Sequence, residues 1–213
     1  MTSLTRRVCG PPPDERAVSD PLLAVGDGHT PLDDDSMFGL KPAWIATRAD
    51  LNSAEQENIL KAMRNRQPTH QLLLTDSYLR HLHKAMFGDV WTWAGSYRRT
   101  NPIIGCEWTL ITGNVRSLVD DVAYWIEMAP YPLDEIAVRF HHRLVAIHPF
   151  PNGNGRHSRL AAGYLANDLG ARPLTWGASL GLSTPDLRRL YIAALVQADR
   201  TDDVSALVTF ALS

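Results

Sequence analysis

The segment from His148 to Arg159, HPFPNGNGRHSR, constrains the fold of this chain more than any other stretch. Apolar residues at helical spacing precede it, but Pro149 disfavours helical backbone at His148 and Pro151 prevents the helix from resuming. Two glycines then flank Asn154, where helical spacing begins again. The sequence therefore predicts two consecutive helices joined by a tight turn.

Helical spacing of apolar residues extends over most of the chain from Met37 onward. The predicted helices cover about 53–66, Asp76–Phe87, Asn114 or Val115 to before Pro130, Leu133–Ile147, Asn154 to about Leu169, Thr184 to about Ala198, and Val204–Leu212. Thr75 and the pair Thr184-Pro185 are typical of helix starts, and Gly170 is typical of a helix end. This pattern favours an all-α fold.

One segment, Tyr97–Thr112, departs from helical spacing. It is rich in Thr, Ile and Trp, and Pro102 and Gly105 separate its two halves. Such a composition favours a small β-hairpin or an extended flap. The predicted fold class is therefore all-α with a minor β excursion.

The beginning of the chain differs in composition from the rest. Residues 1–36 contain a run of prolines and a run of aspartates, and the first aromatic residue is Phe38. Such a segment has little apolar surface to bury against the entropy cost of ordering it. We predict a flexible or extended arm at 1–36, followed by one domain at 37–213.

The overall composition excludes several classes of protein. With 213 residues, 45% hydrophobic residues and a net charge of -2, the chain lacks the positive excess that drives nonspecific binding to nucleic acid or anionic membranes. Cys9 and Cys106 are too few for a disulfide scaffold or an all-cysteine zinc site. No segment is long and apolar enough to span a bilayer, and residues 1–10 lack a signal-peptide core. We expect a cytoplasmic protein with no direct nucleic acid partner and no membrane partner.

The predicted turn has the chemistry of an anion pocket beside a base. Gly153 and Gly155 allow successive N–H groups to point at one spot, where the next helix adds partial positive charge. Arg156 and Arg159 are three residues apart, so both guanidinium groups leave the same helix face. A neutral His148 can accept a proton from an incoming hydroxyl. The simpler alternative is a mere interhelical turn with solvated arginines, but the combination favours a polyphosphate site.

Other histidines have plainer explanations. His141, His142, His148 and His157 do not suggest a metal site, because the first two point to different helix faces and no Asp or Glu joins them at ligand spacing. We expect His141 to be packed or to contact a residue of the site, and His157 to be solvated.

The turn segment resembles the signature of the Fic (Fido) family, H-P-F-x-[D/E]-G-N-G-R-x-x-R. The resemblance implies an all-α Fic core whose usual reaction transfers AMP from ATP to a Ser, Thr or Tyr hydroxyl of a protein target. It also implies that His148 is the catalytic base. The implied ATP- and phosphate-binding residues are Gly153, Asn154, Gly155, Arg156 and Arg159.

The same resemblance extends to other parts of the chain. It implies that Tyr97–Thr112, including Ile103, Ile104 and Gly105, is a flap that docks the target protein. From about Thr30 to the C-terminus the chain is also similar to a bacterial subgroup named mobile mystery protein B. That similarity implies a mobile-element setting and a neighbouring helix-turn-helix partner protein.

Two positions of the signature bear on its chemistry. Asn152 stands where the family has Asp or Glu, the residue that holds Mg²⁺ on the phosphates. Because an amide oxygen is a weaker ligand than a carboxylate, we expect Mg²⁺ or Mn²⁺ to be bound weakly at Asn152. Gly155 keeps the usual anion pocket, whereas Doc-like kinases carry Lys there. The kinase reaction is therefore disfavoured.

The stretch Ser53-Ala54-Glu55-Gln56-Glu57-Asn58 resembles the inhibitory helix motif of Fic proteins, [S/T]-x-x-x-E-[G/N]. That resemblance implies that Ser53, Glu57 and Asn58 form the inhibitory set, and that Glu57 pairs with Arg159 and obstructs the γ-phosphate. The alternative is that Ser53 and Gln56 are a helix capping box. Both interpretations stay open on the sequence.

The leading hypothesis is a Fic-type protein adenylyltransferase that uses ATP as its substrate. Two alternatives remain: a Fic-fold transferase of another phosphate-containing moiety, such as another nucleotide or phosphocholine, and a non-catalytic Fic module that binds nucleotide or a partner.

Overall fold

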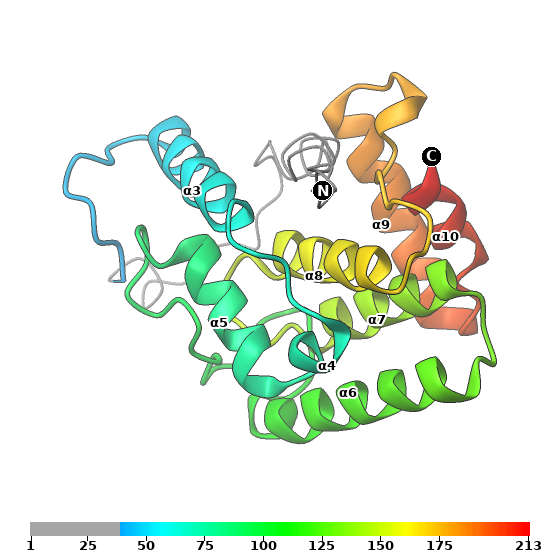
Figure 1. Cartoon of the computed structure of the whole chain (residues 1–213). Coiled ribbons are helices and arrows are strands. Elements are labelled where there is room, and N and C mark those ends of the chain that lie inside the picture. The colour runs from blue at the N-terminus through cyan, green and yellow to red at the C-terminus, as the bar shows by residue number, and fades with distance from the viewer. Residues whose placement is uncertain (1–38) are drawn as a thin grey trace, which may run out of the picture.

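The computed structural model describes residues 39–213, and within them the fold is helical (Figure 1). The predicted arm at 1–36 lies outside the described residues. The elements are α3 (Arg48–Met63), α4 (His70–Leu73), α5 (Asp76–Phe87), η1 (Trp108–Leu110), α6 (Ile111–Met128), α7 (Leu133–Ile147), α8 (Asn154–Asp168), η2 (Ala178–Leu180), α9 (Thr184–Thr201) and α10 (Ser205–Leu212). The all-α fold class predicted from the sequence is confirmed.

The helices whose ends carry strong local signals begin and end where the sequence predicts. The Thr75 hydroxyl accepts the Tyr78 N–H at the start of α5, and α7 has the predicted bounds. Helix α8 begins at Asn154, and Gly170 follows its end with a φ of 72°. Local capping chemistry therefore determines these boundaries.

Helix α3 begins earlier than predicted. Its cap is Thr47, whose side chain accepts the Asp50 N–H while the Asp50 carboxylate accepts the Thr47 N–H, and together they form a capping box. Ser53 lies inside the helix, so the capping box predicted for Ser53 and Gln56 is wrong.

The predicted β-hairpin at 97–112 is also wrong. Residues 39–213 contain one isolated bridge, between Leu40 and Trp91, and no strand. The segment is irregular up to η1, and two of its backbone donors bond to the junction of α7 and the following turn. The Arg98 N–H donates to the Pro149 carbonyl at 3.0 Å, and the Cys106 N–H donates to the Ile147 carbonyl at 3.3 Å.

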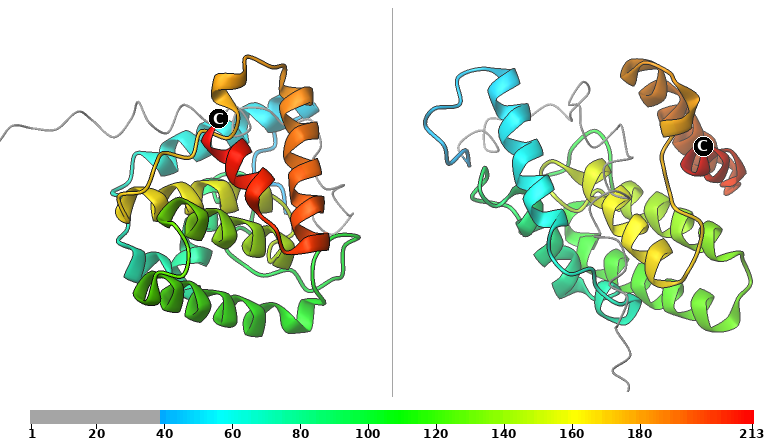
Figure 2. Two further views of the ribbon diagram at one scale, coloured as in Figure 1. Left: turned by 90° about the vertical axis from the view of Figure 1, so that its right-hand side faces the viewer. Right: turned by 45° about the horizontal axis from the view of Figure 1, so that its top comes forward.

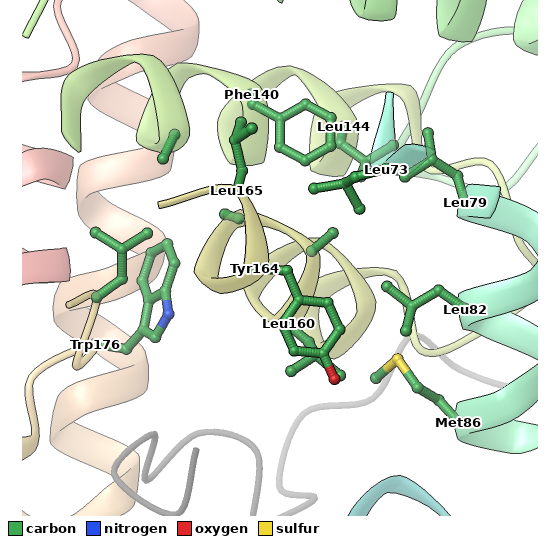
Figure 3. Close-up of a cluster of buried hydrophobic side chains, with 14 of the residues drawn as sticks. Leu73, Leu79, Leu82, Met86, Phe140, Leu144, Leu160, Tyr164, Leu165 and Trp176 are labelled. Atoms are coloured by element: carbon green, nitrogen blue, oxygen red, sulfur yellow. The ribbon is translucent and has the colours of Figure 1, made fainter. Parts of the chain in front are cut away.

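Helices α7 and α8 pack along each other and form the centre of the fold, with α6 against α7 and α3 against α5 (Figure 1). Helices α9 and α10 pack on each other and lie at one end of the fold, as Figure 1 and the right view of Figure 2 show. Figure 3 shows how α8 is enclosed by apolar side chains from several elements. The labelled residues of this cluster are Leu73, Leu79, Leu82, Met86, Phe140, Leu144, Leu160, Tyr164, Leu165 and Trp176. This burial fixes the turn that joins α7 to α8.

The described helices were also compared with the requirements for crossing a membrane. Within residues 39–213, no helix combines the length and apolar character that crossing a bilayer requires.

Candidate active site

His148 terminates α7 in a strained backbone conformation. Its φ of 53° and ψ of 59° are left-handed, because Pro149 disfavours the helical alternative. The His148 N–H still donates to the Leu144 carbonyl at 3.3 Å, and the residue is buried. A left-handed residue other than glycine costs roughly 1 kcal/mol and needs support from its surroundings. The imidazole is therefore attached to a fixed backbone.

The environment of His148 keeps its imidazole neutral. Burial lowers the pKa of His148 to about 4, and the positive charge of Arg98 acts in the same direction. A hydrogen bond with the Val145 backbone opposes this shift. Above pH 5 the ring can therefore accept a proton, as a general base requires.

The turn after His148 is held by hydrogen bonds within itself. The Asn154 side chain accepts the Phe150 N–H at 2.9 Å and donates to the Phe150 carbonyl at 2.8 Å. Gly153 has a φ of 77°, and a Cβ there would lie 2.6 Å from the Phe87 ring. Glycine is therefore required at this position, and the Asn154 side chain closes the turn.

Asn152 and His83 hold the turn through hydrogen bonds to its backbone. The Asn152 side-chain oxygen accepts the Gly153 N–H at 2.7 Å, and its carbonyl accepts from the His83 Nε2 at 3.0 Å. Burial keeps the pKa of His83 well below its usual value, and the ring stacks on Phe150 with 3.7 Å between centroids. The Gly153 N–H therefore has an acceptor already. The backbone N–H groups available to an anion are therefore those of the first turn of α8, which have no acceptor within the helix. No motif in the sequence indicated His83.

The two signature arginines are buried and are held by different helices. The Arg156 guanidinium forms an ion pair with the Glu55 carboxylate at 2.8 Å and lies over the Phe87 ring. Arg159 lies over the Tyr191 ring, with 5.3 Å from its central carbon to the centroid. The arginine pair is therefore not the solvated helix face of the simpler interpretation.

The predicted inhibitory contact is not the one that α3 makes. Glu57 and Ser53 are exposed, and the charge of Glu57 acts on Lys61. Glu55, with 1% of its surface exposed, is the carboxylate that enters the site, where it also accepts the Trp91 Nε1–H at 2.7 Å. The predicted pairing of Glu57 with Arg159 is wrong, because Glu55 occupies the buried face of α3 and Glu57, two residues further along the helix, lies on the opposite, exposed face.

Asn58 has a structural contact. Its side chain donates to the Ala85 carbonyl at 2.9 Å and accepts the Asp89 N–H at 2.8 Å. These bonds join α3 to the C-terminal end of α5 and to the residues after it, and they explain the burial of Asn58 without a role in inhibition.

Helix α9 completes the site from the far end of the chain. The Tyr191 hydroxyl lies 3.1 Å from the His141 Nε2, and burial keeps the pKa of His141 well below its usual value. A Cβ on Gly155 would lie 4.0 Å from the Tyr191 hydroxyl and 3.5 Å from Arg159. A large side chain at Gly155 would therefore meet both groups. The sequence signature gives no hint of Tyr191, which lies outside it.

Two further histidine predictions can now be compared with the structure. His141 is buried, as predicted. His157 is fully buried as well, and its ring nitrogen Nε2 lies 2.9 Å from the Leu79 carbonyl, so its predicted solvation is wrong. The spacing of α8 did not reveal this, because α8 is surrounded on nearly every side.

The donor set near the turn does not fit a protein-held Mg²⁺ ion. Asn152 offers one amide oxygen, which already accepts the Gly153 N–H. The nearest buried carboxylate described above, Glu55, is bound by Arg156 and Trp91. Within residues 39–213, no group of three or more His, Cys, Asp or Glu side chains could hold an ion. Mg²⁺ is usually held by carboxylates together with substrate phosphates, so this chain offers it little.

Comparison with known proteins shows what this architecture is similar to. Residues 73–166 match the model of the Fic/DOC family. The matched range contains α5, α6, α7 and nearly all of α8, and therefore the whole turn from His148 to Arg159. Over this range the chain is similar to the Fic/DOC family.

Solved structures with the same fold extend over more of the chain. The BepC protein of Bartonella tribocorum with bound AMPPNP is 18% identical, with a TM-score of 0.62 over 84% of this chain and 92% of that one. An N-terminal Fic domain of Bartonella quintana with bound ADP is 17% identical, with a TM-score of 0.60 over 79% and 86%. Fic-1 from C. elegans is 21% identical, with a TM-score of 0.56 over 81% and 50%. At these identities the likeness shows a shared fold.

Proposed function

We propose that this protein is an adenylyltransferase that moves AMP from ATP to a Ser, Thr or Tyr hydroxyl of a protein target. The observation that carries the proposal is the placement of a neutral, buried His148 directly before the first turn of α8, with two buried arginines on that helix. Nucleotides bound to BepC and to the Bartonella quintana domain support ATP as the donor.

In the proposed reaction, the phosphates of ATP lie at the N-terminus of α8. The N–H groups of Asn154 and Gly155 and the helix dipole stabilise the negative charge on the α-phosphate. Arg159, positioned by the Tyr191 ring, binds the outer phosphates together with Arg156. Asn154 also keeps the turn closed through its bonds to Phe150.

His148 then activates the target. Its neutral imidazole takes the proton of the target hydroxyl, and the hydroxyl oxygen forms a bond to the α-phosphorus. The bond from the α-phosphorus to the bridging oxygen breaks, and pyrophosphate leaves. Catalysis rests on positioning and on charge stabilisation by groups that are already in place. No step depends on a metal ion held by the protein.

The flap supplies a surface for the target. Ile103 and Ile104 are 99% and 58% exposed, and Trp108 and Leu110 are also largely exposed. The backbone of Gly105 passes directly beside His148, since a Cβ there would lie 2.7 Å from that of His148. A target segment bound to these apolar side chains would therefore present its hydroxyl next to the imidazole.

Self-inhibition by Glu57 is not part of this proposal, because Glu57 is exposed and away from Arg159. The kinship with mobile mystery protein B, and its helix-turn-helix partner, stay predictions of the sequence.

The transferred group is the first thing to measure. We expect incubation with ATP and Mg²⁺ or Mn²⁺ to add the mass of AMP to the protein itself or to a co-purifying protein, as read by intact-mass spectrometry. Parallel incubations with other nucleoside triphosphates and with CDP-choline test for a different phosphate-containing moiety. Binding of AMPPNP without a mass increment from any donor would instead favour a non-catalytic module.

A further inference from the structure

The C-terminal end of α7 poses a physical problem at the position of the proposed base. The last carbonyl groups of a helix have no donor within the helix, and they form the negative end of its dipole. In α7 this end lies at Ile147 and His148, both of which are buried, and the Val145 backbone is hydrogen-bonded with the His148 side chain. Buried carbonyls without donors would be costly and would leave the strained His148 backbone unsupported.

Arg98 solves this problem from outside the helix. Its Nε donates to the His148 carbonyl at 2.6 Å, and its Nη2 donates to the Ile147 carbonyl at 3.3 Å. The side chain is buried, with 4% of the residue exposed, and no ion pair within residues 39–213 involves it. Its positive charge is therefore directed to the carbonyl end of α7.

The same guanidinium also binds the flap. Its Nη1 donates to the Thr100 carbonyl at 2.7 Å, and its Nη2 donates to the Cys106 carbonyl. The flap and the helix end are further joined by the Cys106 N–H, which donates to the Ile147 carbonyl. One buried side chain thus connects four carbonyl groups on two separate segments.

The fit between the flap and His148 is tight at Gly105. Gly105 has a φ of 117°, and a Cβ there would lie 2.7 Å from the His148 Cβ and 2.9 Å from the Arg98 Nη2. The flap therefore has little freedom to shift while Arg98 is bound. Since the flap is the proposed docking surface, its register on α7 decides where a target hydroxyl arrives relative to the imidazole.

We propose that Arg98 is a positioning residue. Its guanidinium holds the flap at a fixed position relative to the His148 backbone, so that a target hydroxyl bound by the flap lies next to the His148 imidazole. The expected effect on AMP transfer rests on the proposed function. The position of the flap relative to the end of α7 can be measured without it. Arginine is needed because its planar fork carries five donors, whereas a lysine ammonium offers three donors on one atom.

The test compares Arg98→Lys and Arg98→Gln with Arg99→Lys, a control at the exposed neighbouring residue. Hydrogen exchange should accelerate at least about tenfold at residues 99–107 in both Arg98 variants, because charge-assisted bonds that hold the flap are lost. The affinity for AMPPNP should stay within about twofold of the parent, since the α8 turn is untouched. Self-labelling from α-labelled ATP should fall by roughly 100-fold, the cost of a misplaced reacting group.

Two results would overturn the inference. One is unchanged labelling and unchanged flap exchange in Arg98→Lys. The other is a common loss of labelling, AMPPNP binding and exchange protection throughout α7 and α8, which would make Arg98 a residue of the fold alone.

If the parent protein shows no self-labelling from α-labelled ATP, the proposed function is contradicted, but the role of Arg98 can still be tested. In that case the pKa of His148, followed by NMR, decides together with flap exchange. The positive charge of Arg98 lowers that pKa, so it should rise in Arg98→Gln and change less in Arg98→Lys. Identical His148 pKa values and flap exchange in all variants would then contradict the inference.

Discussion

The turn between α7 and α8 and the helix α3 contribute to the same site, but they are held in place differently. The turn is fixed by bonds among its own residues, such as those of Asn154 with Phe150. Helix α3 is fixed by residues far along the chain, since Glu55 binds Arg156 and Trp91. The turn also carries the neutral, buried His148, whereas α3 buries the charged Glu55, which pairs with Arg156. Different perturbations should therefore destabilise the two regions: loss of a charge for α3, and acid or an added side chain for the turn.

Breaking the charged pair of α3 should have the largest effect on stability. The variant Glu55→Gln keeps an acceptor for Trp91 but leaves the buried Arg156 charge without its counter-ion. We expect the free energy of unfolding to fall by about 3 kcal/mol or more, as measured by urea denaturation.

Glu57→Gly serves as the matched comparison on the same helix. Because Glu57 is exposed, this change should cost only about 1 kcal/mol, the penalty of glycine in a helix. It should leave self-labelling unchanged. Stronger labelling in Glu57→Gly would restore the inhibitory role that the sequence predicted.

Acid should act on the turn. The pKa of His148 is about 4 in the folded protein and about 6.5 in the unfolded chain, so the unfolded state binds more protons between these values. Stability should therefore be intact above pH 6.5 and should fall as the pH drops toward 4, by about 3 kcal/mol from this residue.

The comparison of the parent with His148→Gln isolates this contribution in urea denaturation at pH 7 and pH 4.5. His157 has a similarly low pKa of about 4 and stays in both proteins. The difference in stability between pH 7 and pH 4.5 should be smaller in His148→Gln, and an equal loss in both proteins would show that His148 is not buried as a neutral ring.

A methyl group at Gly153 should disrupt the turn directly. Gly153→Ala combines a left-handed backbone with a Cβ placed 2.6 Å from the Phe87 ring, and should lower the free energy of unfolding by about 2 kcal/mol. On the same helix, an added Cβ at Gly163 would meet nothing within 4 Å, so Gly163→Ala should stabilise by about 0.5–1 kcal/mol. Equal effects of the two substitutions would refute the packing assigned to the turn.

A carboxylate in the turn should create the metal ligand that the chain lacks. We expect Asn152→Asp to bind Mn²⁺ about tenfold more tightly in the presence of AMPPNP, as measured by calorimetry, and to increase the Mg²⁺ dependence of transfer. If Mn²⁺ affinity and metal dependence match the parent, the amide at Asn152 is no handicap.

The same difference between local and distant contacts explains what the sequence could predict. The bounds of α7, the start of α8 and the closed turn follow from Pro149, Gly153 and neighbouring residues, whose effects act within a few positions. For helix α3 the local pattern indicated a capping box at Ser53 and Gln56, whereas the helix begins at the box of Thr47 and Asp50. Which carboxylate of α3 enters the site depends on its packing against distant residues, and Glu55 rather than Glu57 meets Arg156.

Contacts between residues far apart in the chain could not be predicted from local sequence patterns. Residues 97–112 have the composition of a hairpin, but the Arg98 guanidinium binds the carbonyls of Thr100 and Cys106, and the Cys106 N–H donates to the Ile147 carbonyl. Tyr191 and His83 reach the site from other helices and belong to no local pattern. Such residues become visible only when packing is known.

The most direct test of the proposed reaction is transfer from α-labelled ATP by His148→Ala, beside His81→Ala as an exposed histidine control. With AMPPNP binding retained, the first variant should lose labelling by a factor of about 100 or more and the second should match the parent. Full labelling in His148→Ala would contradict the account, because the proton would then leave the hydroxyl without this base.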